Sequence, residues 1–421
     1  MLKLGKFGGS SLATLERLSN VLRIVKEDSN RKIIVVSAPG KGFCSEEKTT
    51  DFLRNVFVIK DEKEKKQSIN FLARKFAEYT QDESFFAIAY NELLACASDE
   101  QAFISRGEYL TALIVAKKLG FAFKDALELI FFDGNGEVDR AKCRAAAEKT
   151  NIDDGVVVPG FYGADEQGKV RLFPRGGGDI TGAILSEAFS ANTYENFTDE
   201  EGVLSADPRI FVEAKTVKKL NYRELETLSR FGANVVCPSV AKYLVGKDIP
   251  LVVCSSFVPS SRFTLVSESP FCSKKNAPKA VAGKSALKIS VKQKIGGLSN
   301  IFIALSKLFT ILGDPLALYL STNDLAFYID EDNSKIPEAI QAIRSSGDFF
   351  ITAEDGFFVL SLVGSFSQTF ARQISRRLNS SGIKVYCVLS YSDKLIYIVK
   401  KSHSTKALIN LANFINETDR G

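Results

Sequence analysis

The run from Lys32 to Gly40, KIIVVSAPG, restricts the fold more than any other segment of this chain. Its β-branched residues are continuous rather than alternating with polar ones, and the run stops at a Pro-Gly turn. Such a strand fits a parallel sheet that is covered on both faces, because a strand with one solvated face alternates. The segment therefore predicts an α/β protein.

Strand and helix signals alternate around this run. The strand LKLGKF ends at Gly8-Gly9, and apolar residues then recur at three- and four-residue steps from Leu15 to Val25. A charged, helix-prone stretch occupies 46–100, and SRGEYLTALIVAKKLG predicts a helix that ends at Gly120. Further strands are expected in DGVVVPGFYG, VRLFPRGGG and NTYENFTD. This order predicts a doubly wound α/β domain with a mainly parallel sheet, to which we assign residues 1–266.

The remaining third of the chain shows a different and repeated pattern. Residues 267–285 are rich in Ser, Lys, Pro and small residues, and we interpret them as a linker. Residues 286–355 and 356–421 each predict the order strand, helix, strand, strand, helix. The segments NDLAFYID and SDKLIYIV align with Tyr328 opposite Tyr397. We therefore expect two small α+β modules.

Composition excludes several classes of protein. A net charge of +5 with no long basic run argues against nucleic acid as a partner. No signal peptide and no membrane-spanning segment is visible, so we expect a cytoplasmic protein with no membrane partner. Seven scattered cysteines without a CxxC pair indicate reduced thiols, and no metal site is predicted. His403 is the single histidine, which leaves Lys, Arg, Asp, Glu, hydroxyl groups and backbone for chemistry.

Three glycine-rich turns follow predicted strands, each with a cation nearby. They are Gly8-Gly9 with Lys6, Gly40 with Lys41, and 176–178 with Arg175. Bare backbone N–H groups at the carboxyl ends of parallel strands can converge on a phosphate. None of the turns matches a P-loop or a dinucleotide fingerprint. We expect the turns to line one crevice, with Asp179 capping the helix that follows the third.

Six segments in order resemble the signatures of aspartokinases. They are KFGGSSLA, VVSAPGK with KTTDFL, SRGEYLTA, PGFYG with RGGGDITGA, NFTDEEGVLSADPRI, and LSRFGANVVCP. The resemblance covers residues 1 to about 260, and the two small modules look like the ACT regulatory domains of that family. It implies an amino acid kinase fold followed by ferredoxin-like ACT modules. It also implies transfer of the γ-phosphoryl group of ATP to the β-carboxylate of L-aspartate, with Mg²⁺.

The resemblance also implies roles for individual residues. Lys6, Arg175 and Asp179 would be catalytic. The acceptor would be bound by Ser37, Thr50, Glu108, Arg175 and Gly178. The nucleotide would be bound by Lys6, Gly8, Gly9, Ser10, Thr198, Asp199, Leu204, Arg209 and Asn234. In this assignment Glu108 neutralises the substrate ammonium and Arg175 pairs with a carboxylate. Phosphoryl transfer needs such positioned charges and backbone donors, and it needs no histidine.

The sequence departs from the family pattern at several of these positions. Gly178 replaces a serine, and Asn234 replaces a lysine that contacts nucleotide in relatives. Loss of one charged contact would weaken ATP binding by about 1.5–3 kcal/mol. The main expectation is an active aspartokinase at the first step towards lysine, threonine, methionine and diaminopimelate. The alternatives are a weakened paralogue that senses amino acids, or an amino acid kinase with another acceptor.

The small modules imply regulation and assembly. In the family, ACT pairs between subunits bind lysine or threonine, so the resemblance implies such an effector and a homo-oligomer, with dimers formed through the modules. The segments KIGGLSNIF and SYSDKLIYI depart from the usual ligand-binding patterns. Loss of feedback control is therefore a second hypothesis.

Overall fold

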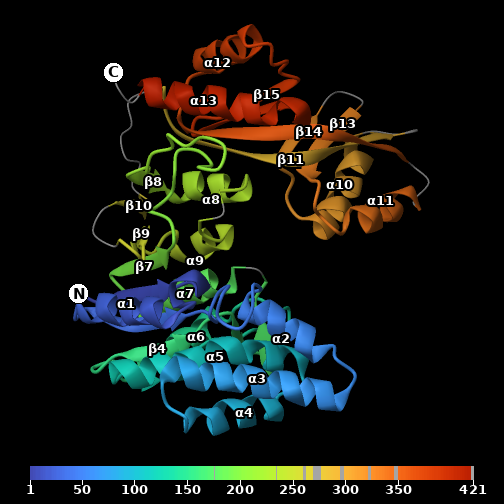
Figure 1. Ribbon diagram of the computed structural model, residues 1–421. Helices are drawn as coiled ribbons and strands as arrows, with labels where there is room; N and C mark the ends of the chain where they lie inside the picture. Colours follow the sequence, from blue (N-terminus) through green and yellow to red (C-terminus); the bar gives the residue numbers. More distant parts are fainter. Residues whose placement is uncertain are drawn as a thin grey trace. The chain divides into compact units, whose positions relative to one another are not determined.

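The computed structural model describes residues 1–174, 176–233, 235–258, 262–268, 276–293, 298–320, 324–345 and 349–418. The chain forms two compact units (Figure 1). Unit 1 comprises Met1–Val203, Lys218–Arg223 and Val235–Pro270. Unit 2 comprises Leu204–Val217, Glu224–Asn234 and Phe271–Gly421. The chain therefore changes unit after residues 203, 217, 223, 234 and 270. The change after residue 223 falls in the first turn of the helix α8 (Tyr222–Arg230).

Unit 1 is built on an eight-stranded sheet. In spatial order its strands are β3 (Ala122–Phe123), β4 (Val156–Pro159), β2 (Arg31–Val36), β1 (Lys3–Phe7), β7 (Thr193–Thr198), β9 (Leu251–Ser255), β10 (Phe263–Ser267) and β8 (Lys219–Asn221). All neighbours run parallel except β9 and β10. The predicted mainly parallel sheet is thus confirmed. A separate two-stranded sheet joins β5 (Tyr162–Ala164) to β6 (Val170–Leu172).

Helices cover both faces of this sheet. The helices of unit 1 are α1 (Leu15–Lys26), α2 (Thr49–Phe57), α3 (Glu62–Thr80), α4 (Phe85–Ala95), α5 (Glu100–Leu119), α6 (Arg140–Glu148), α7 (Gly177–Ala188) and α9 (Ala241–Leu244). α5 contacts β2, β3 and β4, while α7 contacts β1, β2 and β7. All residues from Ile33 to Val36 are fully buried, as a doubly covered strand requires. The predicted end of α5 at Gly120 is confirmed, and Gly120 adopts the left-handed conformation.

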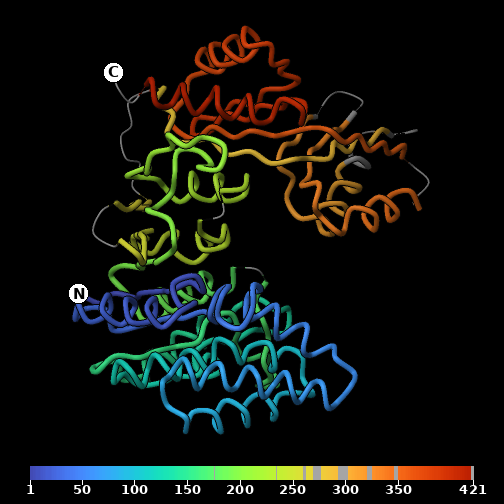
Figure 2. The backbone as a smooth tube through the Cα atoms, in the orientation of Figure 1, coloured from blue at the N-terminus to red at the C-terminus, as the bar shows by residue number. Residues whose placement is uncertain are grey.

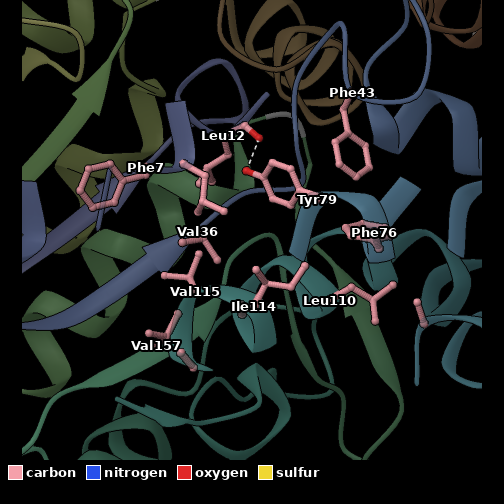
Figure 3. Close-up of a cluster of buried hydrophobic side chains, with 14 of the residues drawn as sticks. Phe7, Leu12, Val36, Phe43, Phe76, Tyr79, Leu110, Ile114, Val115 and Val157 are labelled. Carbon is pink, nitrogen blue, oxygen red and sulfur yellow. Dashed lines mark hydrogen bonds between the residues drawn. The ribbon is translucent and has the colours of Figure 1, made fainter. Parts of the chain in front are cut away.

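A large hydrophobic core lies between the sheet and the helices α1 to α5 (Figure 3). Ile34 and Val36 contribute from β2, while their neighbours Ile33 and Val35 face the other side. The aromatic ring of Tyr79 lies in this core, and its hydroxyl donates a hydrogen bond to the carbonyl oxygen of Leu12 at 2.6 Å. This bond ties α3 to the turn that follows β1.

Unit 2 is built on a six-stranded antiparallel sheet. Its spatial order is β12 (Ala317–Leu320), β13 (Asp324–Asp330), β11 (Ala277–Gln293), β14 (Phe349–Ser365), β16 (Lys394–Lys400) and β15 (Cys387–Ser390). The helices are α10 (Leu298–Leu312), α11 (Ile336–Arg344), α12 (Gln368–Ser380) and α13 (Ser404–Thr418). The two long strands β11 and β14 pair along most of their length, and their path can be followed in Figure 2.

Two separate cores show that this sheet serves two modules. Ile289 of β11 and Ile351 of β14 lie in one core with residues of α10 and α11. Val281 of β11 and Leu360 of β14 lie in the other core with residues of α12 and α13. The repeated pattern of the sequence is confirmed as two α+β modules, because β13 and β16 occupy equivalent places beside β11 and β14.

The domain boundaries differ from the sequence interpretation in two places. Residues 204–217 and 224–234, which we assigned to the first domain, belong to unit 2. Residues 277–285, which we interpreted as part of a linker, are the first half of β11 and belong to the second module. Their small side chains make room for large ones on β14, since a Cβ atom at Gly283 would lie 2.3 Å from the ring of Phe358. The low bulk that suggested a linker is therefore a packing requirement.

The first module of unit 2 leaves one sheet surface open. Lys288, Ser290 and Lys292 alternate with the core residues Ile289 and Val291, so they point to the side away from α10 and α11. A hollow of about 760 Å³ lies there.

No helix in the described part of the chain is long and apolar enough to cross a membrane. The cysteines that the structure describes are all free.

Candidate active site

A cleft of about 900 Å³ opens where β1, β2 and β7 end. Because these strands are parallel, their carboxyl ends meet at one edge of the sheet. The predicted site residues that line the cleft are Lys6, Gly8, Gly9, Ser10, Ser37, Thr50, Glu108, Gly178, Asp179 and Asp199. The glycine turns expected to share one crevice therefore do so in unit 1.

The first two glycine turns touch each other. Gly9 begins the short 3₁₀ helix Gly9–Leu12 directly after β1, and its carbonyl oxygen accepts a hydrogen bond from the N–H of Gly40 at 2.8 Å. A Cβ atom at Gly9 would lie 2.8 Å from the carbonyl oxygen of Ala38, so no larger residue fits without displacing the backbone. This contact places two stretches of bare backbone side by side at the cleft.

Hydrogen bonds of hydroxyl groups and backbone link the turn that follows β1 to the end of β7. Ser11 hydrogen-bonds Ser256 through their Oγ atoms at 2.7 Å, and the N–H of Ser256 donates to the carbonyl oxygen of Thr198 at 2.7 Å. Thr198 Oγ1 in turn donates to Asp199 Oδ1 at 3.0 Å. The turn after β1 is therefore fixed to the end of β7.

The third glycine turn begins α7, and here the sequence interpretation needs one correction. The N-cap residue is Gly176, in the left-handed conformation that favours glycine, with φ of 86°. Asp179 lies in the first turn of α7 rather than at its cap. Gly178 faces the cleft, since a Cβ atom there would lie 3.0 Å from Ser37 Oγ. Arg175 lies outside the described residues, as does Asn234.

The Asp179 side chain takes part in a buried charge cluster. Lys6 Nζ lies 2.5 Å from Asp179 Oδ1 and donates to Asn196 Oδ1 at 3.5 Å. Asn196 Nδ2 donates to Asp179 Oδ1 at 3.2 Å, and the N–H of Cys237 donates to Asp179 Oδ2 at 2.9 Å. The sequence interpretation did not anticipate Asn196. The register of the strands would have revealed it, because Lys6 pairs with Asn196 across β1 and β7.

Glu108 presents a second carboxyl group to the cleft. It lies on α5 with 4% of its surface exposed, and its Oε2 has no hydrogen-bond partner among the described residues. Burial raises the pKa of Glu108 to about 8, although a hydrogen bond from the Ala38 backbone and the charge of Arg54 oppose this shift. A buried carboxyl group with a free oxygen can accept an ammonium group.

Further cations line the cleft, and the sequence interpretation assigned no role to three of them. They are Arg17, Lys48 and Arg54, beside Lys41 of the second turn. Arg17 donates to the carbonyl oxygen of Ser10 at 2.9 Å. An excess of positive charge suits a polyanionic ligand.

Two predicted nucleotide residues belong to the other unit. Leu204 and Arg209 are part of unit 2, where Arg209 pairs with Asp207 at 2.6 Å. Ala206 and Phe211, on either side of this turn, lie in the core of the second module. In the described part of the chain, no three or more His, Cys, Asp or Glu side chains gather as a metal site.

Comparison with known proteins gives consistent matches. Residues 1–255 match the amino acid kinase family. The chain is 26% identical over 422 residues to an aspartokinase of Bacillus sp. (strain MGA3), covering 96% of this chain and 94% of the relative. It is 30% identical over 298 residues to aspartokinase 3 of Bacillus subtilis (strain 168), covering 63% of each.

Solved structures match both units. The aspartate kinase of Clostridium acetobutylicum superposes with a TM-score of 0.85 at 28% identity and covers 99% of this chain and 100% of that one. Aspartokinase III of Escherichia coli, solved with aspartate and ADP, superposes with a TM-score of 0.81 at 20% identity and full coverage, a likeness of fold.

Proposed function

This chain belongs to the amino acid kinase family, and from its likeness to aspartokinases within that family we propose that it is one itself. It would then transfer the γ-phosphoryl group of ATP to the β-carboxylate of L-aspartate. The observation that carries the proposal is the meeting of Lys6, Glu108 and two glycine turns in one cleft. Such a cleft offers cation, carboxylate and bare backbone to a phosphate and an amino acid at once.

The chemistry needs little from the protein beyond positioning. The β-carboxylate of aspartate is ionised at neutral pH, so it attacks the γ-phosphorus without a general base. A new bond forms between its oxygen and phosphorus while the bond from phosphorus to the β,γ-bridging oxygen breaks. The products are ADP and 4-phospho-L-aspartate.

The residue roles in this proposal are those that the family resemblance implies, and the lining of the cleft supports several of them. Lys6 stabilises charge on the transferring group, and the turn formed by Gly8, Gly9 and Ser10 faces the phosphates. The N–H groups of Gly9 and Ser10 are the donors in this proposal, because the N–H of Gly8 donates to the carbonyl oxygen of Phe197. Glu108 holds the ammonium group of aspartate. Ser37, Thr50, Arg175 and Gly178 complete the acceptor site in this proposal.

Thr198, Asp199, Leu204, Arg209 and Asn234 serve the nucleotide in the same proposal. Mg²⁺ enters with the nucleotide as MgATP, and Asp179 and Asp199 are the cleft carboxylates that would face its water ligands.

A hydroxamate assay tests this function. The purified protein is incubated with MgATP and aspartate, glutamate, carbamate or UMP, and acyl phosphate and ADP are measured. We expect acyl phosphate with aspartate alone, and a loss of about 10²-fold or more in turnover for Lys6→Ala. Thermal melting shows whether the variant is folded. Wild-type protein without turnover of aspartate would contradict the proposal and favour a sensor or another acceptor.

We also propose that two copies associate through the ACT-like modules. On the open sheet face of the first module, Phe350 is 59% exposed and Tyr319 is half exposed, beside the hollow lined by Lys288 and Lys292. Exposed aromatic residues around a hollow are typical of interfaces. Sedimentation equilibrium should give a dimer, and Phe350→Glu should give a monomer.

Regulation is the remaining part of the proposal. Lysine or threonine would act at these modules, unless the departures in KIGGLSNIF and SYSDKLIYI have removed feedback control. Rates measured with lysine or threonine near millimolar concentration distinguish retained feedback control from its loss. Clear inhibition by either one refutes the loss of control.

A further inference from the structure

Asn196 hydrogen-bonds both Lys6 and Asp179 in the cleft. It begins the segment NFTDEEGVLSADPRI, but the family resemblance gives it no role. It is fully buried in β7, directly opposite Lys6 of β1 in the sheet register. A buried amide in a strand is costly unless its donor and acceptor are both used. Here its acceptor faces Lys6 and its donor faces Asp179.

The side-chain amide of Asn196 suits a position between an ammonium group and a carboxylate. It accepts a hydrogen bond from an ammonium group and donates one to a carboxylate while remaining neutral itself. A carboxylate at residue 196 could only accept, and it would place a second negative charge near Asp179, whose Oδ1 lies 3.2 Å from the amide nitrogen. An aliphatic residue would leave both neighbours with one partner fewer.

We infer that Asn196 is a positioning residue, which holds the Lys6 ammonium and the Asp179 carboxylate in their places without changing the net charge of the site. The inference rests on the proposed function, because it acts through two residues of that reaction. Lys6 then points at the cleft with one neutralising carboxylate beside it, and its third N–H group stays available to a phosphate oxygen.

Two variants of similar size separate this role from a merely structural one. In Asn196→Asp, the new carboxyl group can mimic the amide only while it is protonated. We expect turnover near that of the wild type at about pH 6, and a relative fall of about tenfold or more by about pH 8.5. In Asn196→Leu, we expect turnover to fall about tenfold or more at every pH, with KM for the acceptor within about threefold.

The surroundings make the pH readout interpretable. The ionisable groups at the cluster are Lys6, Asp179, the Cys237 thiol and the Tyr194 phenol. Burial raises the pKa values of Cys237 and Tyr194, so both stay neutral in this range. Glu108 of the same cleft also titrates in this range, and it does so in the wild type as well. A step that appears in Asn196→Asp and not in the wild type would therefore belong to the new carboxyl group at residue 196.

A matched control and a second readout complete the experiment. Asn416 is a buried asparagine of unit 2, and its Nδ2 donates to the carbonyl oxygen of Glu213. Asn416→Asp should lower thermal stability without adding a step to the pH profile. Calorimetry measures ATP binding without acceptor, so this readout does not depend on aspartate being the substrate. In Asn196→Asp, we expect the affinity for ATP to fall as pH rises. Profiles parallel to the wild type in both assays, or an unchanged turnover in Asn196→Leu, would overturn the inference.

Discussion

The ionisation of Glu108 should control how tightly the enzyme binds aspartate. The carboxyl group is neutral below its pKa of about 8 and charged above it, and only the charged form pairs with an ammonium group. The substrate ammonium stays protonated throughout this range. Aspartate binding should therefore strengthen as pH rises towards about 8.5 and then level off.

The size of the effect follows from the titration. With a pKa of about 8, the ionised fraction of Glu108 is about 0.03 at about pH 6.5 and about 0.76 at about pH 8.5, a ratio of about 25. We expect KM for aspartate to fall by about that factor between these pH values, while KM for ATP changes little. Initial rates with coupled detection of ADP, at saturating MgATP, measure both constants.

Glu108→Gln provides the control. A neutral amide forfeits a charge-assisted hydrogen bond of about 1.5–3 kcal/mol, so at about pH 8.5 KM for aspartate should be about 10- to 150-fold above that of the wild type. The variant's KM should not depend on pH, so the difference should shrink towards about pH 6.5. A KM that stays flat in the wild type, or a Gln variant with the original slope, would refute the reasoning.

The stability of the same variant checks the burial argument. The pKa of Glu108 is raised from 4.5 in the unfolded chain to about 8 in the folded one. The unfolded state therefore ionises first, and the folded protein loses stability as pH rises between these values. Glu108→Gln should melt no lower than the wild type at about pH 8.5.

Three further substitutions test how the site is held. Tyr79→Phe removes the hydrogen bond to Leu12 and should lower stability by about 1–2 kcal/mol while raising KM for ATP, measured by melting and kinetics. Gly178→Ser places a Cβ atom 3.0 Å from Ser37 Oγ and should lower turnover; Ser37→Ala should offset part of the loss in a double-mutant cycle. Phe211→Ala should destabilise the protein by about 3–5 kcal/mol and raise KM for ATP, because Arg209 shares that turn.

Matched controls lie in the same chain. The Tyr397 hydroxyl donates to the carbonyl oxygen of Ala371 at 3.1 Å in unit 2, so Tyr397→Phe should have a similar effect on stability without the ATP effect. Leu305→Ala should open a cavity in the first module with KM for ATP unchanged. Equal shifts of KM for ATP in the test and control variants would show that these shifts reflect general destabilisation.

Much of the catalytic unit was predictable because its signals are local. Continuous β-branched runs and glycine turns identify buried parallel strands and their carboxyl ends from neighbouring residues alone. The sequence could not reveal Asn196, whose place depends on the register between β1 and β7.

Two of the corrections have similar causes. Residues 277–285 have the composition of a linker, but they form a strand that pairs with β14. The bulky side chains of β14 that require small residues there, such as Phe358 opposite Gly283, are distant in the sequence. Asp179 looked like a helix cap because the left-handed turn at Gly176 is not visible in the sequence.

The repeated passage of the chain between units 1 and 2 limits how this protein can be dissected or recombined. Cutting after residue 270 would strip Ala206 and Phe211 of the partners that cover them, so a shortened chain would expose apolar surface instead of yielding an unregulated kinase. Exchange of the C-terminal modules between relatives should therefore succeed only when residues 204–217 and 224–234 travel with them.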